Sequence, residues 1–120
     1  MRSRRRAASE RGLATIWVLT WCGLLCAMTA AGMALAQVVI LRHHLSSAAD
    51  SAALAAAGTT VDGDGCRTAA RIATAHGVRL DRCDIDGDGS TVTVRVSAPT
   101  PGLVGGVIPR MTGQARAGPP

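Results

Sequence analysis

The sequence predicts an α+β protein: a long N-terminal transmembrane helix extends outside the membrane and is followed by a small module of one helix and a β-hairpin. Three observations support this. Residues 13–41 form an uncharged apolar run, an alanine-rich segment follows, and "TVTVRV" alternates strictly between polar and apolar residues. With 120 residues, the chain has room for one domain at most. We divide it into a basic cytoplasmic tail (1–12), a transmembrane helix (13–41), an alanine-rich helix extension (42–58) and an extracytoplasmic α+β module (59–120).

Positive charge is concentrated at the N-terminus. Five arginines and one glutamate give the first twelve residues a charge of +4, whereas eight arginines and seven aspartates leave residues 42–120 at +1. This later part contains no Phe, Tyr or Trp, so it lacks the basic patch and the stacking aromatics of a nucleic-acid surface. The positive-inside rule instead predicts a cytoplasmic N-terminus and an external C-terminus. The residues that set this topology are Arg2, Arg4, Arg5, Arg6 and Arg11.

The uncharged run of 29 residues is long enough to cross a membrane. As a helix it would measure roughly 43 Å at about 1.5 Å per residue, and a bilayer core requires only about 20 residues. The rest of the chain is too small to surround it as a buried core helix. We therefore expect a single-pass protein of the cell membrane.

A cleaved signal peptide is the competing interpretation of the same run. Ala34-Leu35-Ala36 before Gln37 offers a small-x-small cleavage site behind a basic and an apolar region. The apolar character continues through "VVIL", however, and the run is longer than the usual 7–15 residues or so of a signal peptide's apolar region. We favour a retained anchor. The alternative is a small, secreted, disulfide-containing binding domain released after Ala36.

Small residues recur at helical spacing inside the run. Small-xxx-small patterns allow membrane helices to pack closely, and they predict a partner helix or a second copy of the chain. Cys22 and Cys26 lie one turn apart and are interpreted as small apolar packing residues. The residues predicted to pack in the membrane are Ala27, Ala31, Gly32 and Ala36.

The helix is expected to continue beyond the membrane through "RHHLSSAADSAALAAAG" and to end at Gly58 as a C-cap. Alanine favours helix strongly but buries little area, so it gives a smooth face suited to close packing. That face is predicted to pack against the chain's own domain or against neighbouring copies. It consists of Leu45, Ala48, Ala49, Ala52 and Ala56.

The module begins with a loop (59–65) and a short helix (66–76) that Gly77 ends. Residues 78–85 form a predicted strand whose apolar residues change phase, and a bulge or bend near Arg82 would restore it. Residues 91–98 alternate cleanly and predict a second strand. A Gly/Pro-rich stretch then leads to "GQARAGPP", which is expected to form a short edge strand.

Three aspartates in "DIDGDG" match the start of an EF-hand calcium loop. Position 12 of that loop, counted from Asp84, is Arg95, where calcium requires a bidentate glutamate, and the flanking segments are strands rather than helices. Asp-Gly repeats between alternating segments are typical of hairpin turns. We therefore predict a turn here and assign no metal site.

Cys66 and Cys83 both lie in the part predicted to be outside, where disulfides persist. A bridge would tie the short helix to the first strand and contribute about 3 kcal/mol in the chain-entropy model. A zinc site that also uses His76 is the alternative, but single cysteines 17 apart lack the paired ligands that zinc sites use. We favour the disulfide.

The sequence predicts no catalytic site and no cofactor. His43 and His44 lie near Ser46, Ser47 and Asp50, but all five belong to one helix and cannot assemble a nucleophile, a base and an orienting group by themselves. They are interpreted as polar residues of the membrane interface. The chain is accordingly not expected to be an enzyme.

The N-terminal part resembles the TadE/TadG-like family, which are pilin-like proteins of Flp (tight adherence) pilus and secretion systems. The resemblance rests on Arg11-Gly12, the long apolar helix and "RHHLSSAADSAALAAA", of which "AADSAALAAA" is the most specific part. Gly65-Cys66, Cys83, "TVTVRV" and the closing "ARAGP" are similar to a short actinobacterial TadE-like type.

This resemblance implies a pseudopilin or pilus-assembly accessory whose partners are other pilin-like or secretion-system membrane proteins. The sequence departs from the family in one respect. Many TadE proteins carry a glutamate a few residues into the apolar segment, where alignment on Arg11-Gly12 places Trp17, and Glu10 precedes the run. Processing by prepilin peptidase and entry into a filament are therefore left open.

Overall fold

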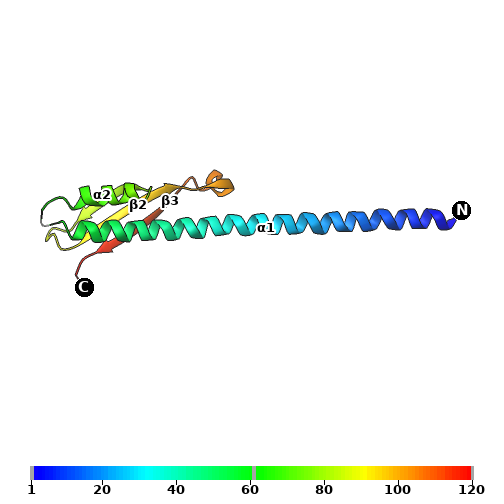
Figure 1. Cartoon of the computed structure of the whole chain (residues 1–120), viewed down its shortest axis with the longest axis horizontal. Helices are drawn as coiled ribbons and strands as arrows, with labels where there is room; N and C mark the ends of the chain where they lie inside the picture. The colour runs from blue at the N-terminus through cyan, green and yellow to red at the C-terminus, as the bar shows by residue number, and fades with distance from the viewer. Residues whose placement is uncertain (1, 61, 120) are drawn as a thin grey trace. The chain divides into compact units, whose positions relative to one another are not determined.

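The computed structural model describes residues 2–60 and 62–119, with side chains from residue 12 onward, and it confirms the α+β class (Figure 1). The chain divides into two compact units, Met1–Leu35 and Ala36–Pro120. The first unit is part of one helix, and the second contains the sheet. The elements are helix α1 (Arg2–Ala57), helix α2 (Gly65–Ala75), strands β1 (Arg79–Ile85), β2 (Val92–Pro99) and β3 (Arg110–Ala117), and the 3₁₀ helix η1 (Gly102–Gly106).

The three strands form an antiparallel sheet in the order β1-β2-β3. β3 pairs with β2 along its whole length, from Val92 opposite Ala117 to Pro99 opposite Arg110. The edge strand expected from "GQARAGPP" is therefore longer than predicted and begins three residues earlier, at Arg110 rather than Gly113. Its inward positions are occupied by Met111, Gly113 and two alanines, so the alternation of β3 is hard to recognise in the sequence.

The phase change in β1 is resolved by an irregularity at the predicted place. Leu80 pairs with Val96 and Arg82 pairs with Arg95, so Asp81 is the extra residue of a bulge. Beyond the bulge, Cys83 lies opposite Val94. Leu80 and Cys83 consequently share one face of the sheet, whereas the sequence pattern alone assigned these two residues to opposite faces.

One face of the sheet packs against the C-terminal part of α1 and against α2, as Figure 1 shows within the second unit. Three valines of β2 form the centre of this layer and are fully buried. Small residues on α1 and β3 allow the helix and strand backbones to approach closely, because little side-chain volume separates them. The core consists of Leu45, Ala48, Ala49, Ala52, Ala53, Ala56, Ala69, Ala73, Val78, Val92, Val94, Val96, Ala98, Ala115 and Ala117.

The "DIDGDG" stretch forms the turn between β1 and β2. The Gly89 amide donates to the Asp86 carbonyl over 2.7 Å, and Gly89 adopts a φ of +70° that favours glycine. The Asp88 carboxylate accepts hydrogen bonds from the amide and the hydroxyl of Ser90. These bonds account for the Asp-Gly pattern as turn chemistry.

Helix α1 ends at Ala57, directly before Gly58, as expected, although Gly58 has no positive φ. Positive φ values occur among the described residues at Gly63, Gly77, Gly89 and Gly102 only. The last carbonyls of α1 are bound instead by threonine hydroxyls: Thr59 donates to Ala55 and Ala56 over 3.2 Å, and Thr60 donates to Ala57 over 3.1 Å. Side-chain donors thus satisfy the helix end without a glycine conformation.

Candidate functional site

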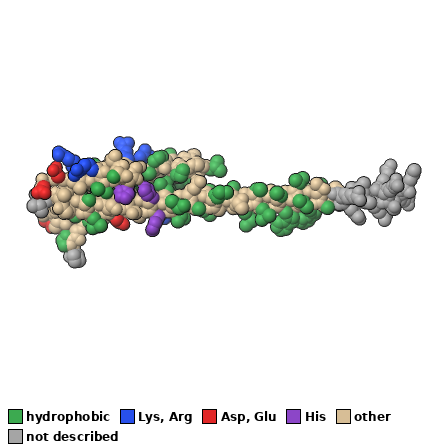
Figure 2. All heavy atoms as spheres, viewed as in Figure 1, with side chains coloured by type: hydrophobic (Ala, Val, Ile, Leu, Met, Phe, Trp, Pro, Cys, Tyr) green, Lys and Arg blue, Asp and Glu red, His purple; other side chains and the backbone are tan. Residues whose placement is uncertain are grey.

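Most of the apolar part of α1 is exposed. By length and composition, α1 contains one candidate membrane span among the described residues, and its most apolar window is not buried at all. Trp17 and Leu19 of the first unit are exposed to 64% and 67%. Figure 2 shows hydrophobic side chains along this unit, whereas the coloured arginine, aspartate and histidine side chains belong to the second. A surface of this kind is suited to lipid or to other apolar helices.

Two threonine hydroxyl groups inside the apolar run have local partners. Thr20 donates to the Ile16 carbonyl over 2.8 Å, and Thr29 donates to the Cys26 carbonyl over 2.9 Å. A polar group in hydrocarbon that lacks a hydrogen-bond partner destabilises the structure by several kcal/mol. These bonds make the run compatible with a bilayer despite its threonines.

The residues predicted to pack in the membrane are all exposed, as are the free cysteines Cys22 and Cys26. Ala27, Ala31, Gly32 and Ala36 are each exposed. The side chains of the five topology arginines, Arg2, Arg4, Arg5, Arg6 and Arg11, lie outside the described residues.

The five residues of the helix extension that were predicted to pack are all buried, each at most 1% exposed. The sequence left open whether this face packs against the chain's own domain or against neighbouring copies. In the structure it packs against the chain's own sheet. Ala53 is a sixth buried residue that sequence reasoning missed. Its position between Ala49 and Ala56 on the helix could have indicated this, because residues three and four apart share a face.

The disulfide between Cys66 and Cys83 is present, with a Cα–Cα separation of 5.8 Å. It joins the first turn of α2 to β1 just beyond the bulge. Cys83 reaches α2 because the bulge at Asp81 turns it toward the helix face of the sheet. His76, the third ligand considered for a zinc site, instead follows the end of α2, where its carbonyl accepts a hydrogen bond from His44 Nε2 over 2.9 Å.

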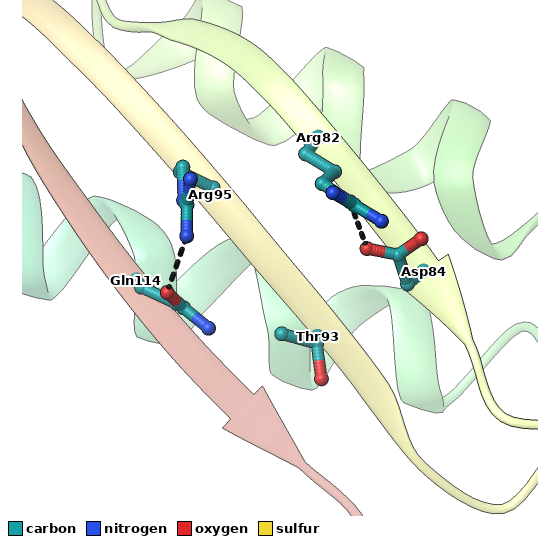
Figure 3. A pocket seen from close by; sticks show the side chains of 5 residues that line it. All are labelled: Arg82, Asp84, Thr93, Arg95 and Gln114. Atoms are coloured by element: carbon teal, nitrogen blue, oxygen red, sulfur yellow. Dashed lines mark hydrogen bonds and ion pairs between the residues drawn. The ribbon is translucent and has the colours of Figure 1, made fainter.

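The second face of the sheet is polar and exposed. Arg82, Asp84, Thr93, Arg95 and Gln114 line a small hollow there, seen in Figure 3. Arg82 Nε binds Asp84 Oδ2 over 2.6 Å, and Arg95 binds Gln114 Oε1 over 3.1 Å. The hydrogen bond and the charge of Asp84 raise the pKa of Arg82.

The Arg82–Asp84 and Arg95–Gln114 pairs are exposed, so they contribute little to stability. Asp86 is bound by Arg116 over 3.0 Å in the same way. Within the described ranges, no three His, Cys, Asp or Glu side chains gather into a group that could hold a metal ion. The face is suited to polar contacts with another protein.

His43 and His44 also lie near the predicted membrane edge. Both are exposed on α1. The rings of His44 and His76 stand edge to face with centroids 6.1 Å apart. The fold thus connects His44 to α2, whereas the sequence grouped it with Ser46, Ser47 and Asp50.

Comparison with known protein families gives one match. Residues 12–59 match the model of the family described as "Putative Flp pilus-assembly TadE/G-like". The match covers the apolar run and its extension, so the resemblance identified in this part of the sequence is confirmed. No curated protein and no solved structure matches the chain.

Proposed function

We propose that the chain is a pilin-like membrane protein that serves as a structural or accessory component of a Flp (tight adherence) pilus or secretion system. The observation that carries this proposal is the position of the family match. It covers the apolar run together with the face on which the sheet is built. The segment shared with pilus-assembly proteins is therefore both the candidate membrane span and the foundation of the second unit.

In this proposal α1 is a retained anchor with its N-terminus in the cytoplasm and the second unit outside. The apolar side chains of residues 13–35 are exposed, which is expected of a lipid-facing helix and costly for a helix in water. The disulfide supports an external location for the second unit, because disulfides persist in oxidising compartments. The role is structural rather than enzymatic and requires no cofactor.

The partners proposed are other pilin-like or secretion-system membrane proteins, or a second copy of this chain. They would contact the small residues at positions 27, 31, 32 and 36, which leave α1 open to close helix packing. Outside the membrane, the polar face of the sheet offers a second contact surface.

Deletion of the gene tests the assembly role, and matched substitutions test the helix face. We expect a deletion strain to lose surface pili, counted by electron microscopy, and the wild-type gene to restore them. Ala31→Leu enlarges one of the small residues at positions 27, 31, 32 and 36 and is expected not to restore pili. Ala30→Leu makes the same change at an exposed residue outside these four positions and is expected to restore them.

Each outcome has a distinct meaning. Pili in normal numbers on the deletion strain would contradict the assembly role. If the deletion strain lacks pili and Ala31→Leu restores them, the result would contradict packing through the small residues and would leave the assembly role standing. Both variants must accumulate in the membrane fraction at the wild-type level for the comparison to hold.

A further inference from the structure

The loop between β2 and β3 presents apolar side chains to the surroundings. Leu103 is 88% exposed, Val107 83% and Ile108 49%. The chain carries no charged residue between Arg95 and Arg110, a stretch that includes η1. Surface loops of soluble proteins are usually polar, and adjacent exposed apolar residues indicate an interaction surface. We call residues 102–108 the apolar loop.

The apolar loop lies beside the last residues of the uncharged run of α1. A Cβ atom placed on Gly102 would be 3.0 Å from Gln37 Oε1. Pro101, which precedes the loop, lines a shallow hollow together with Gln37, Ile40 and Leu41. Figure 1 shows the loop, in orange, alongside α1 within the second unit. The exposed side chains of the loop and of the end of the run therefore occur at the same level of the helix.

The backbone of this loop is well supported. Val107 and Ile108 donate to the Val104 carbonyl over 3.0 and 2.8 Å, and Thr100 donates to Pro109 over 3.1 Å across its base. Gly105 lies against the Thr100 carbonyl so closely that a side chain would not fit. The loop thus holds Leu103 and Val107 outward in a defined turn, although no described part of the chain covers them.

Basic residues flank the apolar surface on the side toward the rest of the second unit. Arg42 is exposed on α1 directly after the uncharged run. Arg110 is exposed at the base of the loop, where its guanidinium donates to Ser97 Oγ over 3.0 Å. An apolar tip with arginines behind it matches the order of acyl chains and anionic headgroups at a bilayer surface.

We propose that the apolar loop inserts Leu103 and Val107 into the headgroup region of the bilayer that α1 spans, as a second contact between the protein and lipid. This inference rests on the proposed membrane function. The loop would fix the second unit against the membrane surface, with Arg42 and Arg110 at the level of the lipid phosphates. The ligand is the lipid surface itself.

The test uses the full-length chain in vesicles of phosphatidylcholine and phosphatidylglycerol, labelled at one cysteine with the fluorophore NBD. The Cys66–Cys83 disulfide is kept oxidised, and Cys22 and Cys26 are replaced by Ala. Leu103→Cys places the label in the apolar loop. Gly87→Cys, in the exposed turn at the other end of β2, is the matched control, because nothing lies within 4 Å of a Cβ there. A third sample keeps Cys26 as the labelled residue and reports on α1.

We expect the label at position 103 to show blue-shifted emission and quenching by lipids that carry a shallow doxyl group, and the label at position 87 to show neither. Water-like emission at position 103, or blue-shifted emission that the doxyl lipids do not quench, would overturn the inference. The second of these results would indicate contact with protein instead of lipid.

The label at Cys26 separates failure of the inference from failure of its premise. Quenching of the label at Cys26 by deep doxyl lipids, without quenching at position 103, would support the membrane span and contradict insertion of the apolar loop. Absence of quenching at Cys26 would contradict the proposed span and the loop insertion together. Preserved circular dichroism spectra and an intact disulfide in each variant show that the labels report on folded protein.

Discussion

Gly113 of β3 lies against the backbone of Leu45 in α1. A Cβ atom placed on Gly113 would be 2.8 Å from the Leu45 carbonyl oxygen and 2.9 Å from its carbonyl carbon. Both neighbours are backbone atoms and cannot move aside as the end of a flexible side chain could. This contact, with the alanines of α1, sets the distance between the helix and the sheet.

Gly113→Ala is therefore expected to destabilise the second unit by roughly 1–3 kcal/mol, the usual cost of overpacking. The measurement is denaturant unfolding of the full chain in nanodiscs, followed by circular dichroism. Gly87→Ala is the control, because Gly87 has open space and no positive φ, and its effect should be small. Equal stability of the two variants would show that the helix and strand can separate without loss.

Val94, at the centre of β2, is fully buried. Val94→Ala removes two carbon atoms from the core and is expected to cost about 2 kcal/mol from lost burial and the resulting cavity. Leu54→Ala removes a larger group from a side chain that is 68% exposed and should leave the unfolding free energy nearly unchanged. A larger loss for Leu54→Ala than for Val94→Ala, in the same unfolding assay, would be incompatible with this core.

The Cys66–Cys83 bridge closes a loop with a sequence separation of 17. Replacing both cysteines by Ala should lower the unfolding free energy by about 3 kcal/mol in the chain-entropy model. Non-reducing peptide mapping of protein from the membrane fraction should show the linked pair. Free thiols at both positions in that preparation would contradict the bridge and weaken the case for an external location.

The turn between β1 and β2 is expected to respond to acid. The Ser90 hydroxyl and amide donate to Asp88 and lower the pKa of its carboxyl below the ordinary value. The stabilisation is therefore complete above the unfolded pKa of about 4 and is lost as the pH falls through the lower folded value. The effect is small because Asp88 is fully exposed.

Unfolding of the wild type and of Asp88→Ala across a pH series checks this. The stability difference between them should be constant from neutral pH down to about pH 5 and should shrink at lower pH. Ser90→Ala should show the same pattern with a smaller difference. A difference that grows on acidification would have the opposite sign and would rule out the proposed linkage.

Much of the fold could be predicted because its signals are local. The uncharged run follows from composition and length, and the alanine face of α1 and the alternation in β2 each follow from a single periodicity. The phase change in β1 was informative because it required a bulge or a bend near Arg82 to restore the alternation. The disulfide was predicted from compartment and loop size, and the bulge is what turns Cys83 toward α2.

The features that were missed depend on contacts between distant segments. β3 was underestimated because Gly113 and the alanines of this strand have little β propensity, and the strand forms there by pairing with β2 and packing against α1. The contact of the apolar loop with Gln37 joins residues 65 positions apart and has no local signal. The hydrogen bond between His44 and the His76 carbonyl also joins distant residues and has no local sequence signal.

The central claim is that α1 is a retained membrane anchor with the second unit outside. Labelling of intact cells that carry the Gly87→Cys variant, with a membrane-impermeant maleimide and intact-mass detection, tests this most directly. The wild type is the control, because its outer cysteines are bonded to each other and Cys22 and Cys26 would lie in lipid. We predict labelling of Gly87→Cys before lysis, on membrane-fraction protein whose mass retains residues 13–41. Labelling only after lysis, or a labelled product in the medium that begins at Gln37, would contradict the account.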